Sequence, residues 1–333
     1  MTAAVQTVLG PVAASELGRI LPHEHIFILD PDIEQNYVIE WGSEEARVAQ
    51  AVQRLDDLKA LGIDTIVDLT VTGLGRYIPR IEQIARQTSV NIVVATGLYT
   101  YDKLPHFFYG RPPGSGTEGR DPLEEMFIHD ITVGIARTGV RAGILKCVTD
   151  EPGVTPDVER VLRSAARAHL ATGVPISTHT HAASRRGLEQ QAIFKEEGVD
   201  LSRVVIGHSG DTEDFGYLTE MLDAGSYLGM DRFGVEHMLT TERRVAVVAE
   251  LCKRGYADQL LLSHDASCYI DWLPKKVVEQ RIPNNHHHLF ISQHVLPLLL
   301  QSGVDESQLD TMMRLNPQRM LTGEPSPPWH QVQ

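Results

Sequence analysis

The chain alternates between short apolar runs and longer segments of helical spacing, and this alternation restricts its fold more than any other feature. Segment 44–61 repeats apolar residues along one helical face, and segment 156–171 follows Thr155 with Pro156, a typical helix start. Strands that are apolar throughout and separated by helices indicate a parallel sheet buried on both faces. Eight runs of this kind occur, at 19–29, 63–71, 91–100, 142–149, 174–180, 203–209, 226–231 and 260–265.

Eight strand-and-helix units favour a closed (β/α)8 TIM barrel over an open, doubly wound sheet. An open sheet of that kind is expected to carry a glycine-rich phosphate turn after its first strand, and none follows 19–29. The sequence contains no internal repeat, low-complexity tract or interdomain linker. We therefore expect an α/β chain with one barrel domain over residues 1–333.

The charge and the cysteine content exclude several classes of partner. Asp and Glu total 44 against 30 Lys and Arg, which gives a net charge of −14 at pH 7. Such a chain lacks the positive surface that nucleic acids and anionic membranes bind, and no apolar run reaches the roughly 18 residues of a membrane helix. The first residues lack a basic signal-peptide start, and the three cysteines show no CxxC spacing. We expect a cytoplasmic protein with reduced thiols that binds neither nucleic acid nor membrane.

Ionisable side chains recur at the carboxyl ends of the expected strands, where a barrel carries its active site. His23 and His25 are two residues apart, so both imidazoles share one face of a strand and can meet one ion. Lys146 lies inside an apolar run, where an unpaired charge is costly. Each of these residues alone has an ordinary structural interpretation, but the joint pattern on five strands predicts a metal site. The later runs add His179, His208 and Asp265.

The sequences around these residues resemble the phosphotriesterase family of the amidohydrolase superfamily, and most closely its phosphotriesterase-like lactonases. The resemblance runs from about Gly18 to Gly323. One departure is His181, which makes a second HxH pair with His179; we assign His179 as the ligand and expect His181 to be a loop histidine. Six motifs carry the resemblance in order: LPHEH (21–25), GILKC (143–147), STHTHAAS (177–184), VVIGHSGDT (204–212), GMDRFG (229–234) and LSHDASCYIDW (262–272).

The resemblance implies two divalent metal ions. It assigns a ligand set to each: His23, His25 and Asp265 to the buried ion, His179 and His208 to the more exposed one, and a carboxylated Lys146 as the bridge. Carboxylation of a buried lysine is physically reasonable, because burial lowers the pKa of the lysine and favours the neutral amine that reacts with carbon dioxide. Such ligands suit zinc first, and also cobalt, iron or manganese.

The activity that the resemblance implies is hydrolysis of lactones, with N-acyl-homoserine lactones and quorum quenching as the expected setting. A metal-bridging hydroxide would be the nucleophile, and Asp265 would accept its proton. Promiscuous hydrolysis of organophosphate triesters should accompany it. Two alternatives stay open: a phosphotriesterase (aryldialkylphosphatase) as the principal activity, and a metal-binding scaffold without catalysis. A homodimer is also implied.

The substrate pocket is carried over from the same resemblance. Tyr99 and Arg232 are expected near the metals, and Cys268, Ile270 and Trp272 in the long loop that follows the eighth strand, residues 266–283. Ordinary structural interpretations compete: Tyr99 as a rim packing residue, Arg232 as an ion-pair partner of a neighbouring aspartate, and Trp272 as the core of the loop. The histidine run at 286–288 is expected to be a solvated helix start.

Overall fold

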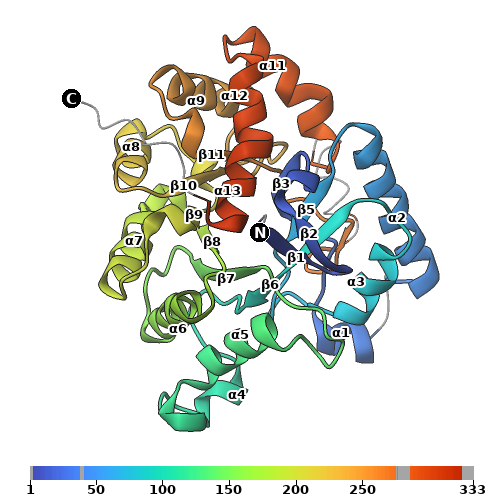
Figure 1. The fold of residues 1–333 in the computed structure, drawn as a ribbon, viewed down its shortest axis with the longest axis vertical. Helices are drawn as coiled ribbons and strands as arrows, with labels where there is room; N and C mark the ends of the chain where they lie inside the picture. Colours follow the sequence, from blue (N-terminus) through green and yellow to red (C-terminus); the bar gives the residue numbers. More distant parts are fainter. Residues whose placement is uncertain (1–2, 38–40, 275, 277–285, 325–333) are drawn as a thin grey trace.

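The structure is a computed structural model that describes residues 3–37, 41–274, 276 and 286–324. Eight parallel strands form one sheet in the order β11-β10-β9-β8-β7-β6-β5-β3, and helices surround it (Figure 1). This is the predicted (β/α)8 barrel, and each predicted apolar run contains one of its strands. The strands are β3 (Ile20–Glu24), β5 (Thr65–Asp68), β6 (Asn91–Gly97), β7 (Ile144–Thr149), β8 (Ile176–Thr180), β9 (Val204–Ile206), β10 (Tyr227–Met230) and β11 (Leu260–Leu262).

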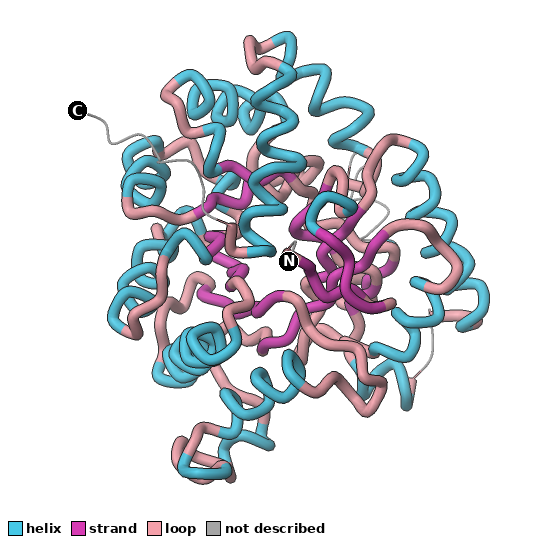
Figure 2. The backbone as a smooth tube through the Cα atoms, in the orientation of Figure 1, coloured by secondary structure: helices cyan, strands magenta, loops and turns pink. Residues whose placement is uncertain are grey.

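The helices form the outer ring of the barrel (Figure 2). Several begin at a capping side chain: Thr155 accepts a hydrogen bond from the backbone N–H of Val158, and Ser43 accepts one from that of Ala46. The helices are α1 (Pro31–Asn36), α2 (Glu44–Ala60), α3 (Ile78–Ala85), α4 (His106–Tyr109), α5 (Pro122–Thr132), α6 (Pro156–Thr172), α7 (Arg186–Glu196), α8 (Phe215–Asp223), α9 (Thr241–Lys253), α11 (Leu296–Gln301), α12 (Glu306–Asp310) and α13 (Asn316–Thr322).

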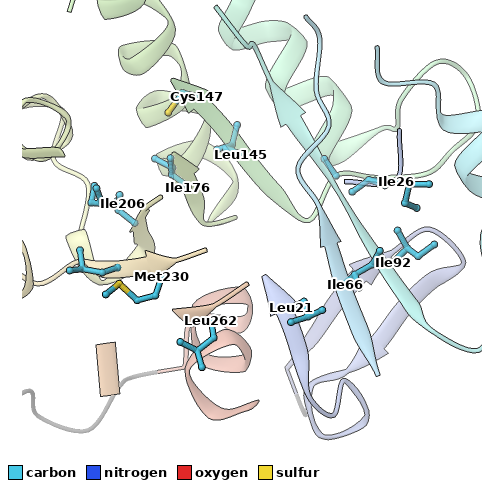
Figure 3. Close-up of a cluster of buried hydrophobic side chains, with 14 of the residues drawn as sticks. Leu21, Ile26, Ile66, Ile92, Leu145, Cys147, Ile176, Ile206, Met230 and Leu262 are labelled. Carbon is cyan, nitrogen blue, oxygen red and sulfur yellow. The ribbon is translucent and has the colours of Figure 1, made fainter. Parts of the chain in front are cut away.

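The apolar residues of the strands divide between two clusters, because successive side chains point to opposite faces. Leu145 and Cys147 of β7 belong to the large cluster between strands and helices, of which Figure 3 labels residues on each of the eight strands. Ile144 belongs to the smaller cluster inside the barrel. Lys146 has the parity of Ile144, so its side chain extends into the barrel, where the register pairs it with Gly97 of β6 and Ser177 of β8.

An N-terminal hairpin covers the end of the barrel at which the strands begin. Its strands, β1 (Ala4–Thr7) and β2 (Gly10–Ala13), pair antiparallel. The backbone N–H of Val8 donates to the carbonyl of Ile92 at the start of β6, and Arg141, just before β7, donates to the side chain of Gln6. The hairpin therefore lies across the amino ends of these strands, away from the residues predicted to act.

A further short pairing lies near the carboxyl ends, where β4 (Phe27–Ile28) runs parallel to β12 (Tyr269–Ile270). Strand β12 belongs to the segment predicted as the long eighth loop, residues 266–283. Residues 275 and 277–283 of this segment lie outside the described part of the chain. Among the described residues, no helix combines the length and the apolar character that crossing a membrane requires.

We predict that Gly97→Ala destabilises the barrel strongly. Gly97 has φ +148°, and a Cβ there would lie 1.8 Å from the carbonyl oxygen of Lys146. Strain and overpacking together should lower the free energy of unfolding by about 3 kcal/mol or more, measured by urea denaturation. Gly62→Ala is the matched control, because Gly62 also has positive φ (+82°) but no atom within 4 Å of the added Cβ. It should cost only about 1 kcal/mol; equal losses would show that the contact with Lys146 is unimportant.

Candidate metal centre

The residues predicted as metal ligands meet at the carboxyl end of the barrel, around one cavity of about 410 Å³. All of them line this cavity, and all are buried except Asp265, which is partly exposed. Parallel strands end on one rim, so residues far apart in the sequence converge there. Three lie within strands and three just beyond them: His23 in β3, Lys146 in β7 and His179 in β8, and His25, His208 and Asp265 after β3, β9 and β11.

One group of donor atoms surrounds Asp265 Oδ1. His23 Nε2 lies 3.4 Å from it and His25 Nε2 lies 3.2 Å from it. These three residues offer donor atoms that all fall within 4.8 Å of one another, a spacing compatible with one shared ion. Lys146 Nζ lies 2.9 Å from His23 Nε2, so the lysine adjoins this group.

A second group lies beside the first. His179 Nδ1 is 3.0 Å from His208 Nε2, and His208 Nε2 is 3.8 Å from Asp265 Oδ2. The rings of His23 and His208 stack with their centroids 4.8 Å apart. The two oxygens of Asp265 thus face one group each, and the structure brings together both sets of predicted ligands.

Two of the candidate ligands have an uncommon backbone conformation. His208 has φ +57° and Asp265 has φ +56°, in the left-handed region that residues other than glycine rarely adopt. Residues held in such conformations cluster at functional sites, where the surrounding structure has to enforce them. Both lie just after a strand, so counting alternate residues along the strand does not place their side chains.

Burial keeps the candidate ligands in forms that can bind a metal. It lowers the pKa of Lys146 to about 8, that of His179 to about 4 and that of His208 to about 3. It also lowers the pKa of His23. Burial alone would raise the pKa of Asp265, but His208 and His23 hold it well below its usual range. Neutral imidazoles and an ionised carboxylate are the forms that act as ligands.

Two aspartates that sequence reasoning did not assign orient these imidazoles. Asp231, after β10, accepts hydrogen bonds from His23 Nδ1 at 2.6 Å and His208 Nδ1 at 2.9 Å, so the Nε2 atoms of both face the centre. Asp150, after β7, accepts one from His179 Nε2 at 2.6 Å, which leaves Nδ1 facing the centre. Such partners fix the tautomer and orientation of a ligating histidine. Their sequence signal is an acidic residue directly after a strand.

Arg232 connects the centre to a further carboxylate. Its Nε donates to Asp265 Oδ2 at 3.0 Å and its Nη1 donates to Asp211 Oδ2 at 2.8 Å. Burial lowers the pKa of a guanidinium, but Asp211 and Asp265 raise that of Arg232 well above its usual value. The predicted pocket residue is therefore a permanent cation, and its partners are Asp265 and Asp211.

Aromatic side chains form the wall of the cavity next to His179. Tyr99 Oη lies 3.3 Å from His179 Nδ1 and 2.7 Å from the hydroxyl of Tyr101, a residue that sequence reasoning did not single out. The ring of Trp272 lies 5.7 Å from that of Tyr99. Burial raises the pKa of Tyr99 well above its usual value, so the phenol keeps its proton. The rest of the wall is mostly apolar: Ile28, Leu74, Val235, Met238, Ile270 and Leu273.

Three sequence expectations concern residues near this wall. Ile270 lines the cavity as expected, whereas Cys268 packs in the hydrophobic cluster and is not among the described lining residues. His181 starts a short 3-10 turn and contacts Ser184, as a loop histidine should. The expectation of a solvated start at 286–288 is wrong, because this run packs against the barrel rim: His288 is buried and its Nε2 donates to the carbonyl of His25 at 3.2 Å.

A (β/α)8 barrel with adjacent imidazole and carboxylate donors on its carboxyl rim defines a class of metal-dependent hydrolases. Comparison with known proteins narrows this class: a model of the phosphotriesterase family matches residues 3–321, and the chain belongs to that family. Enzymes of the family are binuclear metal hydrolases of the amidohydrolase type, which agrees with the His and Asp clusters found here.

Individual relatives span almost the whole chain. A phosphotriesterase homology protein of Mycobacterium tuberculosis is 58% identical over 317 residues, which cover 95% of this chain and 97% of that protein. An aryldialkylphosphatase of Saccharolobus solfataricus is 36% identical over 312 residues, covering 93% and 97%. The solved structure of the phosphotriesterase from Mycobacterium tuberculosis matches with a TM-score of 0.93 at 57% identity, covering 96% of this chain and 98% of that one.

For the metal-free protein, we expect the free energy of unfolding to fall as the pH drops from about 6.5 to about 4. His179 and His208 have folded-state pKa values of about 4 and 3, against 6.5 for an ordinary histidine. Between those values the unfolded chain binds more protons than the folded one, so acid favours unfolding. At about pH 5.5 each histidine should contribute a loss of about 1 kcal/mol. Urea denaturation of chelator-treated protein measures it.

The variant His179→Asn is the matched control for this pH dependence. It removes one buried imidazole but keeps a polar side chain, so its stability should change less steeply with pH over the same interval. Identical slopes in the variant and in wild type would contradict the assignment of His179 as a neutral buried histidine.

Proposed function

We propose that the protein is a hydrolase with two divalent metal ions that opens lactones, with N-acyl-homoserine lactones as its substrate class and quorum quenching as its role. The observation that carries the proposal is the pair of donor groups on either side of Asp265, at the base of a cavity with a mostly apolar wall. Such a cavity suits a ligand that combines a reactive ester with an aliphatic chain.

The donor set fits a pair of transition-metal ions. It consists of four imidazoles and one ionised carboxylate. The outward nitrogens of the imidazoles are already hydrogen-bonded, to Asp231, Asp150 or Thr70. We assign one ion to His23, His25 and Asp265, the second to His179 and His208, and a carboxylated Lys146 as the bridge. Zinc is the expected metal, with cobalt, iron or manganese as substitutes. When bound, the ions supply an activated water and polarise the substrate's carbonyl oxygen.

The other chemical roles fall to side chains of the rim. Asp265 stays ionised, and its Oδ2, next to Arg232, is placed to accept the proton that the attacking water gives up. Arg232 stabilises that carboxylate and orients it. Tyr99 keeps its proton and can donate a hydrogen bond to an oxygen of the substrate. Ile270 and Trp272, which line the cavity, would contact the acyl chain, whereas Cys268, expected at the pocket, lies in the hydrophobic cluster.

The second candidate for the principal activity is the hydrolysis of phosphotriesters. The relative named aryldialkylphosphatase favours this candidate. Both substrates present a polarisable oxygen and a leaving group to the same centre, so activity on both is expected. A scaffold without catalysis would need no group to accept a proton, and the ionised Asp265 therefore counts against it. One domain over residues 1–333, a homodimer and a cytoplasmic location also stay predictions.

We predict that the purified protein carries about two transition-metal ions per chain, and that Lys146→Ala loses most of one ion and at least about 100-fold in kcat/KM. The reason is that a carboxylated Lys146 would supply an anion shared by both ions, and alanine cannot. Metal analysis alongside lactone turnover measures both quantities, and chelator should abolish activity until zinc or cobalt is added. A variant with two ions and nearly normal turnover would refute the bridging carbamate.

We predict that wild type prefers long acyl chains and that Trp272→Ala flattens this preference. Each methylene buried against the wall is worth about 0.8 kcal/mol, so kcat/KM should rise over lactones with about four, eight and twelve acyl carbons until the cavity is full. Paraoxon serves as the control substrate, since it has no acyl chain and should lose less activity. Equal losses on all of these substrates would mean that Trp272 supports the fold rather than the selectivity.

A further inference from the structure

The barrel has a seam between its first and last strands. The hydrogen-bonded ladder runs from β3 round to β11, and among the described residues no ladder joins β11 back to β3. The candidate ligands of the first donor group lie on both sides of this seam: His23 and His25 on the β3 side, and Asp265 on the other. Their mutual distances therefore depend on whatever joins the two edges.

Backbone hydrogen bonds supply part of that join. The N–H of Asp265 donates to the carbonyl of His23 at 3.0 Å, and the N–H of His25 donates to that of Ala266 at 2.9 Å. They hold the segment 263–266 against the end of β3. This segment includes the left-handed conformation of Asp265, which an L-residue adopts only where its surroundings require it.

The side chain of Glu24 supplies the rest. Glu24 stands between His23 and His25 and is fully buried, and it is not among the described residues that line the cavity. Its carboxylate accepts hydrogen bonds from the segment across the seam: Oε1 from Ser263 Oγ at 2.8 Å, from His264 N at 2.9 Å and from His264 Nδ1 at 2.7 Å, and Oε2 from Ala266 N at 3.1 Å.

These bonds bracket Asp265 on both sides, since their donors are the two residues before it and the one after it. Ser263 extends the connection to the ligands, because its Oγ also accepts a hydrogen bond from the backbone N–H of His23 at 3.0 Å. One carboxylate therefore fixes the strained turn and ties it to the strand that carries the two histidines.

We infer that Glu24 is a positioning residue that closes the seam of the barrel and sets the position of Asp265 relative to His23 and His25, and thereby the affinity for the ion that these three residues hold. This inference rests on the proposed function, because it assumes that the donor group binds a metal. Glu24 itself touches neither the ion nor the substrate.

The test is Glu24→Gln, which keeps the size of the side chain but replaces one oxygen by an amide that cannot accept a hydrogen bond. Either the bond from Ala266 or those from Ser263 and His264 must be lost. Partners of ligating residues typically contribute about 10- to 100-fold in metal affinity, and we expect a loss of that size for one of the two ions in a chelator competition with zinc. The visible spectrum of the cobalt-loaded protein should change as well.

Asp130→Asn is the matched control. Asp130 is a buried carboxylate of α5 that accepts hydrogen bonds from Arg76 and Thr96 and lies outside the donor groups. It should lower the melting temperature and leave zinc affinity and the cobalt spectrum unchanged. Ser263→Ala is a second variant for the case that Glu24→Gln does not fold. It removes the two hydrogen bonds of Ser263 Oγ and keeps those that Glu24 accepts from His264 and Ala266, so it should shift both readouts in the same direction by a smaller amount.

The outcomes distinguish a failure of the proposed function from a failure of the role assigned to Glu24. If wild type does not take up two ions, the proposed function fails. If wild type binds two ions, and Glu24→Gln and Ser263→Ala bind zinc as tightly as wild type with the same cobalt spectrum, the role of Glu24 is overturned. A loss of affinity in Asp130→Asn equal to that in Glu24→Gln would also overturn it, because general destabilisation would then explain both.

Discussion

Ionisable side chains at the rim of the barrel are held out of water, and each therefore has to be neutral or matched by an opposite charge. Burial lowers the pKa of Lys146 to about 8, and Asp265 and Asp231 offset the charge that remains. Asp231 meets this condition through His208 and His23, which hold its pKa well below the usual range although burial alone would raise it. Arg232 meets it through two carboxylates. The centre is thus a set of mutually compensating groups, in which the loss of one exposes its neighbours to an uncompensated desolvation cost.

The sequence was sufficient for the barrel because its signals are periodic. Apolar runs of strand length separated by helical spacing located all eight strands, and Lys146, singled out as a cation within such a run, extends into the barrel. The candidate ligands His23 and His25 were accessible to the same reasoning, since they are two residues apart at the end of β3. The N-terminal hairpin was missed because its short strands carry few apolar residues and pair outside the barrel.

What the sequence could not provide are contacts made beyond the strands. Asp150 and Asp231 were not assigned, since which histidine each one reaches depends on the path of a loop rather than on a period. Cys268 was expected at the pocket from the resemblance but packs in the core, because its direction depends on the path of the loop after Asp265, which the resemblance did not specify. The run 286–288 was misjudged for a related reason: its composition is polar, yet His288 bonds to the carbonyl of His25 at the rim.

The hairpin formed by β1 and β2 affects how substrate enters the cavity and how product leaves it. It lies across the amino ends of β6 and β7, and an apolar cluster fills the barrel above it, so the described residues leave the centre open on the carboxyl side. Substrate and product therefore use the same opening of the cavity. For the acyl lactones proposed above, the hydrolysed product must leave before the next substrate enters, and an aliphatic tail held against the wall near Trp272 would delay that exchange. Under that proposal a longer acyl chain strengthens substrate binding and slows product release, so we expect turnover at saturation to be fastest on substrates shorter than those that bind most tightly.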